Sequence, residues 1–175
     1  MGFSVTITSS IVLIVILAIS SSFLITVFQG IKEISYTVKE YACRERERFN
    51  AALQLRVDSV SATECNITVK NTGSNVIFLK DQNEFKWNTI IISYGNDSFW
   101  RSYPVEEYEI LEVKVSGTNH TFTLDKHSFI NAGEEAKISF YIPNGAPEIP
   151  IQGLVSVVFV THYGVTAKAE AVREQ

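Results

Sequence analysis

The first part of this sequence has no charged residue. From Gly2 to Ile31 it contains no Lys, Arg, Asp, Glu or His. A bilayer core requires about 17 to 25 apolar residues in one helix, and few soluble helices can bury so long an uncharged run. We therefore predict that residues 1–31 form a transmembrane helix. A cleaved signal peptide is disfavoured, because it needs a basic start, a shorter apolar run and a small-residue cleavage site.

Motifs for catalysis are also missing. The chain has no Cys-x-x-Cys, His-Glu-x-x-His, Gly-x-Ser-x-Gly or phosphate-loop sequence. Its histidines, His120, His127 and His162, are too scattered for metal-ligand spacing, although the first two could share a corner with Asp125 and Glu134. The net charge is −4, and no basic patch carries interleaved aromatic residues, which argues against nucleic-acid binding. We predict a protein that is not an enzyme, with no cofactor, no metal and no nucleic-acid partner.

Cysteine is scarce, with only Cys43 and Cys65 in the chain. In an oxidising compartment these two could form one disulfide, which would stabilise the fold by about 3 kcal/mol for a loop of this length. The alternative is two unpaired thiols that behave as small, buried apolar residues. The Cα separation decides between the two, and a sequence does not contain it. Both interpretations remain open.

The helix is predicted to continue beyond the apolar run. Between Ile31 and Leu53 there is no proline or glycine, and apolar residues recur at helical spacing, so residues 32–52 are expected to form an amphipathic stalk. The whole helix would have about fifty residues and a length of about 75 Å. The alternating charges from Arg44 to Arg48 mainly supply intrahelical pairs. In the apolar part, Ser20-Ser21-Ser22 could support helix association or bond back to helix carbonyls.

The composition changes after the stalk, in residues 53–175. Alternating β-branched and aromatic residues are interrupted by turn signals every eight to twelve residues or so, which predicts an all-β, immunoglobulin-like sandwich. The segment from Pro143 to Pro150 holds three prolines and is expected to be a loop between the sheet layers. The expected strands are Leu53–Ser61, Cys65–Asn71, Val76–Leu79, Thr89–Tyr94, Phe99–Tyr103, Glu109–Val115, Thr121–Leu124, Ala136–Ile142, Leu154–His162 and Val165–Val172.

Two signals disagree about the side of the membrane on which this domain lies. The Lys and Arg residues that follow the helix would favour the cytoplasm by the positive-inside rule. Three N-glycosylation acceptor sequences, at Asn66, Asn96 and Asn119, favour the exterior. All three lie where strand ends or turns are predicted, and acidic residues dilute the positive charge of the stalk. We therefore place the β-domain outside the cell, on a single-pass protein of the cytoplasmic membrane.

Aromatic residues indicate candidate partner contacts, because Tyr and Trp are frequent at contact hot spots. Phe99, Trp100 and Tyr103 cluster in a region of short strands, and Tyr163 lies in the last hairpin. We expect Trp100 at the surface and Trp87 in the core. Small side chains on one face of the last strand would allow close pairing with a second copy, through the edge or the face of that strand. These residues are Val165, Ala167, Ala169 and Ala171.

Several short motifs carry a resemblance to a known family. Met1-Gly2-Phe3-Ser4 opens onto the uncharged helix, and Asn71-Thr72-Gly73 follows a predicted strand. Ala132-Gly133-Glu134-Glu135 forms a turn, and Thr161-His162-Tyr163-Gly164-Val165 lies near the end. In these features the chain resembles FlaF, an accessory family of the archaellum (the archaeal flagellum), and its sibling FlaG. The resemblance implies a helix like that of type IV pilins and a dimeric sandwich outside the membrane. It also implies that the sandwich binds the surface-layer protein and anchors the motor as part of a stator.

The start of the chain departs from the pilin pattern. Pilin subunits usually carry a basic residue and a glycine ahead of the apolar helix, and bacterial pilins carry an acid a few positions into it. Here position five is Val5, and no basic residue precedes the run. Our leading hypothesis is therefore a membrane-anchored stator component that binds the surface layer, as a homodimer or together with a sibling subunit. The rival hypothesis is a filament subunit that polymerises through its N-terminal helix.

Overall fold

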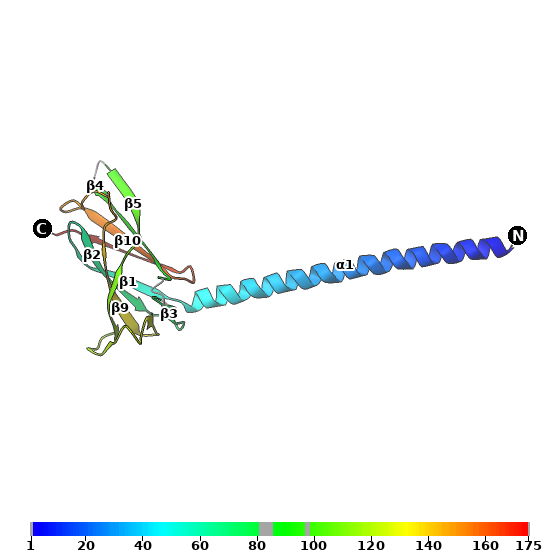
Figure 1. Ribbon diagram of the computed structural model, residues 1–175, viewed down its shortest axis with the longest axis horizontal. Coiled ribbons are helices and arrows are strands. Elements are labelled where there is room, and N and C mark those ends of the chain that lie inside the picture. The colour runs from blue at the N-terminus through cyan, green and yellow to red at the C-terminus, as the bar shows by residue number, and fades with distance from the viewer. Residues whose placement is uncertain (1, 81–85, 97–98, 175) are drawn as a thin grey trace. The chain divides into compact units, whose positions relative to one another are not determined.

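The computed structural model describes residues 2–80, 86–96 and 99–174. A single long helix, α1 (Gly2–Asn50), precedes two packed antiparallel sheets, and the predicted class of an N-terminal helix followed by a β-sandwich is thus confirmed (Figure 1). The chain divides into two compact units, residues 1–45 and 46–175. The strands are β1 (Leu53–Val60), β2 (Glu64–Asn71), β3 (Ile77–Phe78), β4 (Thr89–Asn96), β5 (Phe99–Val105), β6 (Glu109–Val115), β7 (Thr121–Phe122), β8 (Phe129–Ile130), β9 (Glu134–Tyr141), β10 (Leu154–Val160) and β11 (Thr166–Val172).

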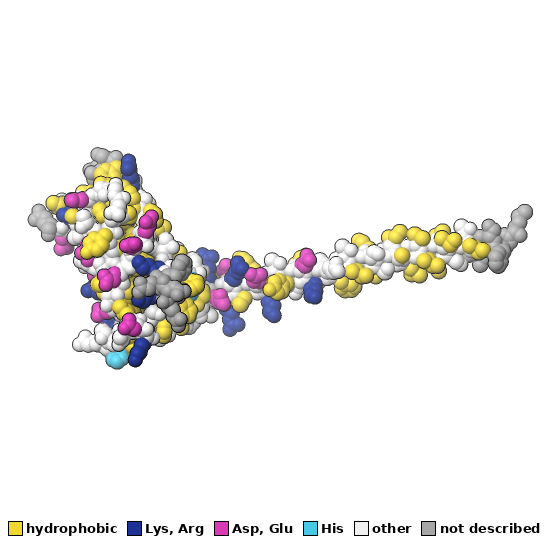
Figure 2. All heavy atoms as spheres, in the orientation of Figure 1, with side chains coloured by type: hydrophobic (Ala, Val, Ile, Leu, Met, Phe, Trp, Pro, Cys, Tyr) yellow, Lys and Arg dark blue, Asp and Glu magenta, His cyan; other side chains and the backbone are white. Residues whose placement is uncertain are grey.

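Helix α1 exposes an apolar surface. Its large apolar side chains are 39% exposed at Val27 and 68% exposed at Phe23 and Phe28. Figure 2 shows apolar side chains around the N-terminal part of the helix and charged side chains toward its C-terminal part. The helix is long and apolar enough to cross a membrane. A surface of this size is not stable in water, so lipid or other helices must cover it.

Several hydroxyl side chains of α1 donate hydrogen bonds back to carbonyl groups of the helix. Ser21 Oγ and Ser22 Oγ each donate to the carbonyl oxygen of Ala18 at 2.9 Å, and Thr26 Oγ1 donates to that of Ser22 at 3.0 Å. Such bonds satisfy hydroxyl groups that an apolar environment would otherwise leave without a partner. The structure therefore shows hydrogen bonds from these serines back to the helix. Helix association through the serines stays a prediction.

The sandwich consists of a five-stranded sheet in the order β1-β2-β9-β6-β7 and a four-stranded sheet in the order β11-β10-β4-β5. The short pair β3–β8 forms a third, two-stranded piece. Each of the ten strands expected from the sequence overlaps an observed strand, whereas β8 was not predicted. Alternate residues of the central strands face inward, as period-2 patterning requires. The largest fully buried side chains are Tyr94, Phe140, Phe159, Ile67, Ile77, Leu79, Ile90, Ile92, Ile130, Ile138, Ile149 and Val69.

The small side chains of β11 face the inside of the sandwich. Ala167 is buried and Ala169 packs against the core, and β11 lies beside β1 of the other sheet. Small side chains let these two strands approach each other closely. The expectation that Ala167 and Ala169 offer a face to a second copy is therefore wrong, whereas pairing along the edge of β11, the outer strand of its sheet, stays a prediction.

The proline-containing loop joins the two sheets, as predicted, because it connects β9 to β10. Tyr94 Oη donates to the carbonyl oxygen of Pro147 at 2.6 Å. Ile149 is fully buried, and its backbone nitrogen donates to Ala62 O at 3.0 Å. The loop is therefore anchored to the core and to the β1–β2 turn.

The last turn of α1 is capped by the turn that follows β2. Ser74 N and Asn75 N donate to the carbonyl oxygen of Asn50 at 2.9 and 3.2 Å, and Asn75 Nδ2 donates to that of Glu47 at 2.9 Å. These bonds satisfy carbonyl groups that have no partner within a helix. Gly73 lies so close to this junction that a Cβ atom would overlap backbone atoms of Asn50 and Ala52.

Candidate functional site

A polar groove of about 510 Å³ lies on the outer face of the five-stranded sheet. Its floor comes from outward-facing positions of β1, β2, β9 and β6, and its wall is the turn between β6 and β7. Register places Gln54 opposite Lys70, Lys70 opposite Glu135, and Glu135 opposite Lys114, so one polar row crosses four strands. The lining residues are Gln54, Arg56, Thr68, Lys70, Lys114, Ser116, Gly117, Thr118, Asn119 and Glu135.

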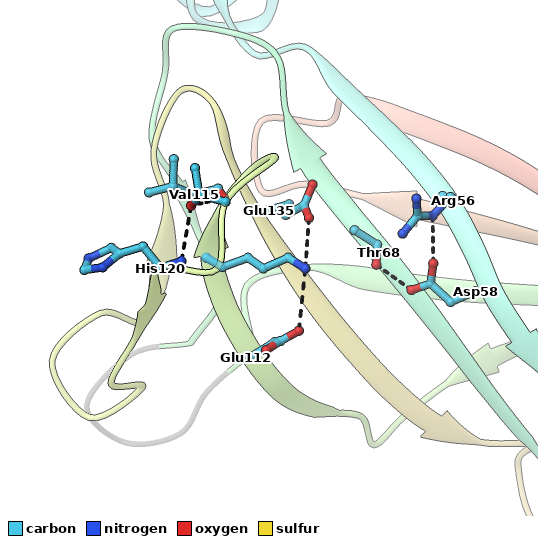
Figure 3. Close-up of polar contacts among 9 residues, drawn as sticks. Arg56, Asp58, Thr68, Glu112, Val115, His120 and Glu135 are labelled. Carbon is cyan, nitrogen blue, oxygen red and sulfur yellow. Dashed lines mark hydrogen bonds and ion pairs between the residues drawn. The ribbon is translucent and has the colours of Figure 1, made fainter.

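Carboxylates neutralise two of the three cations in the polar groove. Arg56 Nε lies 2.7 Å from Asp58 Oδ1, whose other oxygen accepts the hydroxyl of Thr68. Lys114 Nζ lies 3.4 Å from Glu135 Oε1 and 3.9 Å from Glu112 Oε1 (Figure 3). Lys70 forms no ion pair within the described residues. The groove thus combines neutral hydrogen-bonding groups with one unpaired ammonium group.

The three predicted glycosylation sites occupy different environments. Asn119 is an exposed residue in the wall of the polar groove. Asn66 lies in β2 and is partly buried, and its Nδ2 donates to Ser59 Oγ at 3.1 Å and to Glu64 Oε1 at 3.4 Å. Asn96 ends β4, and the next two residues of its acceptor sequence lie outside the described residues. Glycosylation at each site stays a prediction.

The two cysteines also differ in environment. Cys43 is exposed, Cys65 is fully buried in the core, and both thiols are free. Burial, together with the nearby carboxylates of Asp58 and Glu64, raises the pKa of Cys65 to about 12. Cys65 therefore matches the description of a small, buried apolar residue, whereas Cys43 does not. Pairing between them stays a prediction.

The predicted partner contacts divide into two places. Phe99, Trp100 and Tyr103 all lie on β5, the outer strand of the four-stranded sheet, and Trp100 is 51% exposed. Tyr163 lies in the β10–β11 turn. Trp100 pairs with Gly95 near one end of β4, whereas Val160, just before that turn, pairs with Thr89 at the other end. The first three therefore share one strand, but Tyr103 packs against the core whereas Trp100 is exposed on the other face of β5. Tyr163 is separated from all three.

An aromatic cluster around His162 was not predicted. The centroid of the His162 ring lies 5.6 Å from the ring centroid of Phe78, 6.3 Å from that of Trp87 and 4.0 Å from that of Tyr163. Burial lowers the pKa of His162. Trp87 is 46% exposed, so its expected place in the core is wrong: it precedes β4, at the end of the sandwich. No motif signals this cluster, because its members come from separate segments.

His127 and Glu134 meet, whereas the other residues of the proposed corner do not form a metal site. His127 Nε2 lies 2.9 Å from Glu134 Oε2. His120 is exposed and packs edge-on against Phe122 with 5.0 Å between ring centroids. Among the described residues no group of three or more His, Cys, Asp or Glu side chains is placed to hold a metal ion.

Comparison with known proteins shows similarity in structure alone. No protein-family model matches the sequence, and no curated protein matches it. A chain from the structure of the archaeal flagellum of Methanospirillum hungatei strain JF1 superposes with a TM-score of 0.61 at 14% identity, over 96% of this chain and 93% of that one. The two chains share one fold. The resemblance to archaellum proteins indicated by the motifs is thus confirmed at the level of the fold.

Two further structures come from Sulfolobus acidocaldarius. The archaellum periplasmic stator protein FlaG matches at 13% identity and a TM-score of 0.43, over 69% of this chain and 100% of that one. A chain of the stator protein complex of FlaF and FlaG matches at 14% identity and a TM-score of 0.43, over 67% of this chain and 88% of that one.

Proposed function

We propose that this protein is a non-enzymatic, membrane-anchored component of an archaellum-type assembly. In this proposal α1 lies in the cytoplasmic membrane, the β-domain lies outside the cell, and the β-domain binds the surface layer as part of a stator. The observation that carries the proposal is the change in the surface of α1, from exposed and apolar to charged. The fold shared with a flagellum chain supports the link to an archaellum-type assembly.

The charges of the stalk favour a tether over a packed filament core. Nine of the seventeen residues from Lys32 to Arg48 are charged. Burying a charge without a partner costs several kcal/mol, so a segment of this composition is poorly suited to the interior of a helix bundle. The uncharged run before it matches the length that a bilayer requires. A helix in lipid followed by a stalk in water gives the uncharged segment an apolar environment and the charged segment an aqueous one.

Binding to the surface layer can be measured with the full-length protein in lipid vesicles. We expect such vesicles to co-sediment with isolated surface-layer sheets, whereas protein-free vesicles stay in the supernatant. Trp100→Ala on β5 should weaken binding about tenfold or more, the scale of a contact hot spot. The matched control is Trp87→Ala, because Trp87 is exposed to a similar extent but precedes β4 at its other end. Absence of co-sedimentation for the unmodified protein would refute surface-layer binding.

A filament subunit is the second candidate. It is favoured by the flagellum chain, whose match includes both the helix and the sandwich. Electron microscopy of the purified full-length protein distinguishes the two functions. Long fibres with a helical core support the filament subunit, whereas discrete particles or dimers support the tether. A homodimer, or an assembly with a sibling subunit, is part of the tether proposal. The candidate contacts with a partner are Phe99, Trp100, Tyr103 and, in a separate place, Tyr163.

A further inference from the structure

We propose that the polar groove holds the first sugars of an N-linked glycan attached to Asn119. The proposal rests on the proposed function in one respect, which is the position of the β-domain outside the cell. It assigns a carbohydrate ligand to the groove, and it selects one acceptor asparagine over another.

The acceptor is displayed on an ordered turn. Thr118 N and Thr118 Oγ1 both donate to Val115 O, at 3.1 and 2.9 Å, and His120 N donates to Thr118 Oγ1 at 3.2 Å. These bonds fix the backbone on both sides of Asn119. The side chains of Asn119 and Thr121 are exposed and form no hydrogen bond within the described residues. Both polar groups of the acceptor sequence are therefore accessible, as expected for a surface loop.

Asn66 lies in the opposite situation. It belongs to β2, which is paired on both sides by β1 and β9. Its Nδ2 is bonded to Ser59 and Glu64, and its Oδ1 is buried. The hydroxyl of Thr68, the last residue of this acceptor sequence, donates to Asp58 and is 8% exposed as a residue. A sugar on Asn66 would have to displace these bonds within a central strand, so this site is expected to stay unmodified.

The chemistry of the polar groove suits a neutral, polyhydroxylated ligand. Its two ion pairs cancel most of the local charge, so it is not an anion site. The remaining groups are amides, hydroxyls and one ammonium, which are the donors and acceptors that sugar hydroxyls require. Its volume of about 510 Å³ lies within the range of about 300–1,000 Å³ that is typical of small-molecule sites. Asn119 is in the wall, so an attached chain needs no linker to reach the floor.

The modification is tested by the intact mass of the full-length protein purified from its native membranes. We expect a mass above that of the polypeptide. Asn119→Gln should remove the mass of one glycan, whereas Asn66→Gln should leave the glycan mass unchanged. A glycan at Asn66, or no change with Asn119→Gln, overturns the proposal. A second measurement distinguishes failure of this inference from failure of the proposed function. The exposed thiol of Cys43 is labelled on whole cells with a membrane-impermeant maleimide. If Cys43 is labelled on whole cells but Asn119 carries no glycan, this inference alone is refuted. If Cys43 is labelled only after the cells are lysed, the placement of the β-domain outside the cell is refuted.

Occupation of the groove is tested by a double-mutant cycle in thermal unfolding. In the glycosylated protein, Asn119→Gln should lower Tm by about 2–4 °C. In the background of Gln54→Ala with Lys70→Ala, whose side chains lie on the groove floor, the same substitution should have almost no effect. Protein from a bacterial host without N-glycosylation is the control, and there Asn119→Gln should leave Tm unchanged. An equal loss of Tm in both groove backgrounds would show that the glycan does not occupy the groove.

Discussion

Glu134 closes the turn between β8 and β9. Its Oε2 accepts hydrogen bonds from Asn131 N at 2.7 Å and from the ring of His127 at 2.9 Å, and its Oε1 accepts one from Asn131 Nδ2 at 3.2 Å. The side chain is 9% exposed. Burial by itself would raise the pKa of Glu134, but these hydrogen bonds outweigh it, so the pKa is lowered overall. The carboxylate is thus the form that the folded state prefers.

Glu134→Gln should destabilise the β-domain at neutral pH by about 1–3 kcal/mol, because the amide replaces charge-assisted hydrogen bonds. The lowered pKa sets the pH dependence. The stabilisation by Glu134 is complete above the pKa of an unfolded glutamate, 4.5, and it is lost as the pH falls through the lower pKa of the folded state. Thermal melts between pH 7 and pH 3 should therefore show the difference between variant and unmodified protein shrinking toward acid. A constant difference across this range would contradict the assignment.

At the scale of residues, sequence patterns predicted which side chains are exposed better than they predicted which residues those side chains contact. Asn119 lies on an exposed turn and Trp100 is half exposed, as expected. The acceptor sequence at Asn66 looked equivalent to that at Asn119, yet the amide of Asn66 donates a hydrogen bond across to Ser59 of β1. Trp87 was misplaced because tryptophan in a sandwich is usually core, whereas here it lies at the end of the sheet. Such environments depend on neighbours that are distant in the chain.

At the scale of elements, Gly73 decides how the β2–β3 turn approaches the end of α1. Gly73→Ala should destabilise the β-domain by at least about 1–3 kcal/mol, the usual cost of overpacking, because the new Cβ meets backbone atoms of Asn50 and Ala52 rather than a movable side chain. Chemical denaturation followed by tryptophan fluorescence measures the loss. Gly30→Ala is the matched control, since nothing lies near its Cβ position and alanine favours a helix. Equal stability of the two variants would be the contradicting result.

The long strands were predictable because alternation and turn residues agree along β1, β2, β4, β6, β9, β10 and β11. The pair β3–β8 was harder to predict from the sequence. Each member has only two strand residues, which is too short for period-2 patterning to appear. The cap of α1 was also outside the reach of the sequence, because Ser74 and Asn75 supply it from the far side of a hairpin.

At the scale of the whole molecule, the decisive property is the change from an uncharged to a highly charged helix. The sequence alone predicted this change, because it depends on composition and length rather than on contacts. What composition cannot predict is the material that covers the apolar surface. The exposed side chains of α1 require either lipid or other helices.

The double variant Leu13→Lys/Leu17→Lys distinguishes lipid from water around this segment. The two residues are 59% and 60% exposed, and each lysine at the centre of a membrane helix costs about 2.5–3.5 kcal/mol. We expect most of the protein to leave the membrane fraction under alkaline carbonate extraction. The control is Glu33→Lys/Thr37→Lys, which adds lysines at the same spacing beyond the uncharged run and should stay in the pellet. Full retention of the first variant would show that lipid does not hold α1.

The junction between α1 and the sandwich has a mechanical consequence. Only Ala51 and Ala52 separate the helix from β1, and the turn after β2 is hydrogen-bonded to Asn50 and Ala52. Tension that reaches the last turn of the helix would pass into β1 and, through these bonds, into β2 as well. Because Leu53 of β1 is paired with Asn71 of β2, the force would enter both strands at the same end and would be shared between them instead of falling on β1 alone. An attachment of this kind spreads a pulling force over more backbone hydrogen bonds than a helix that is joined to one strand alone.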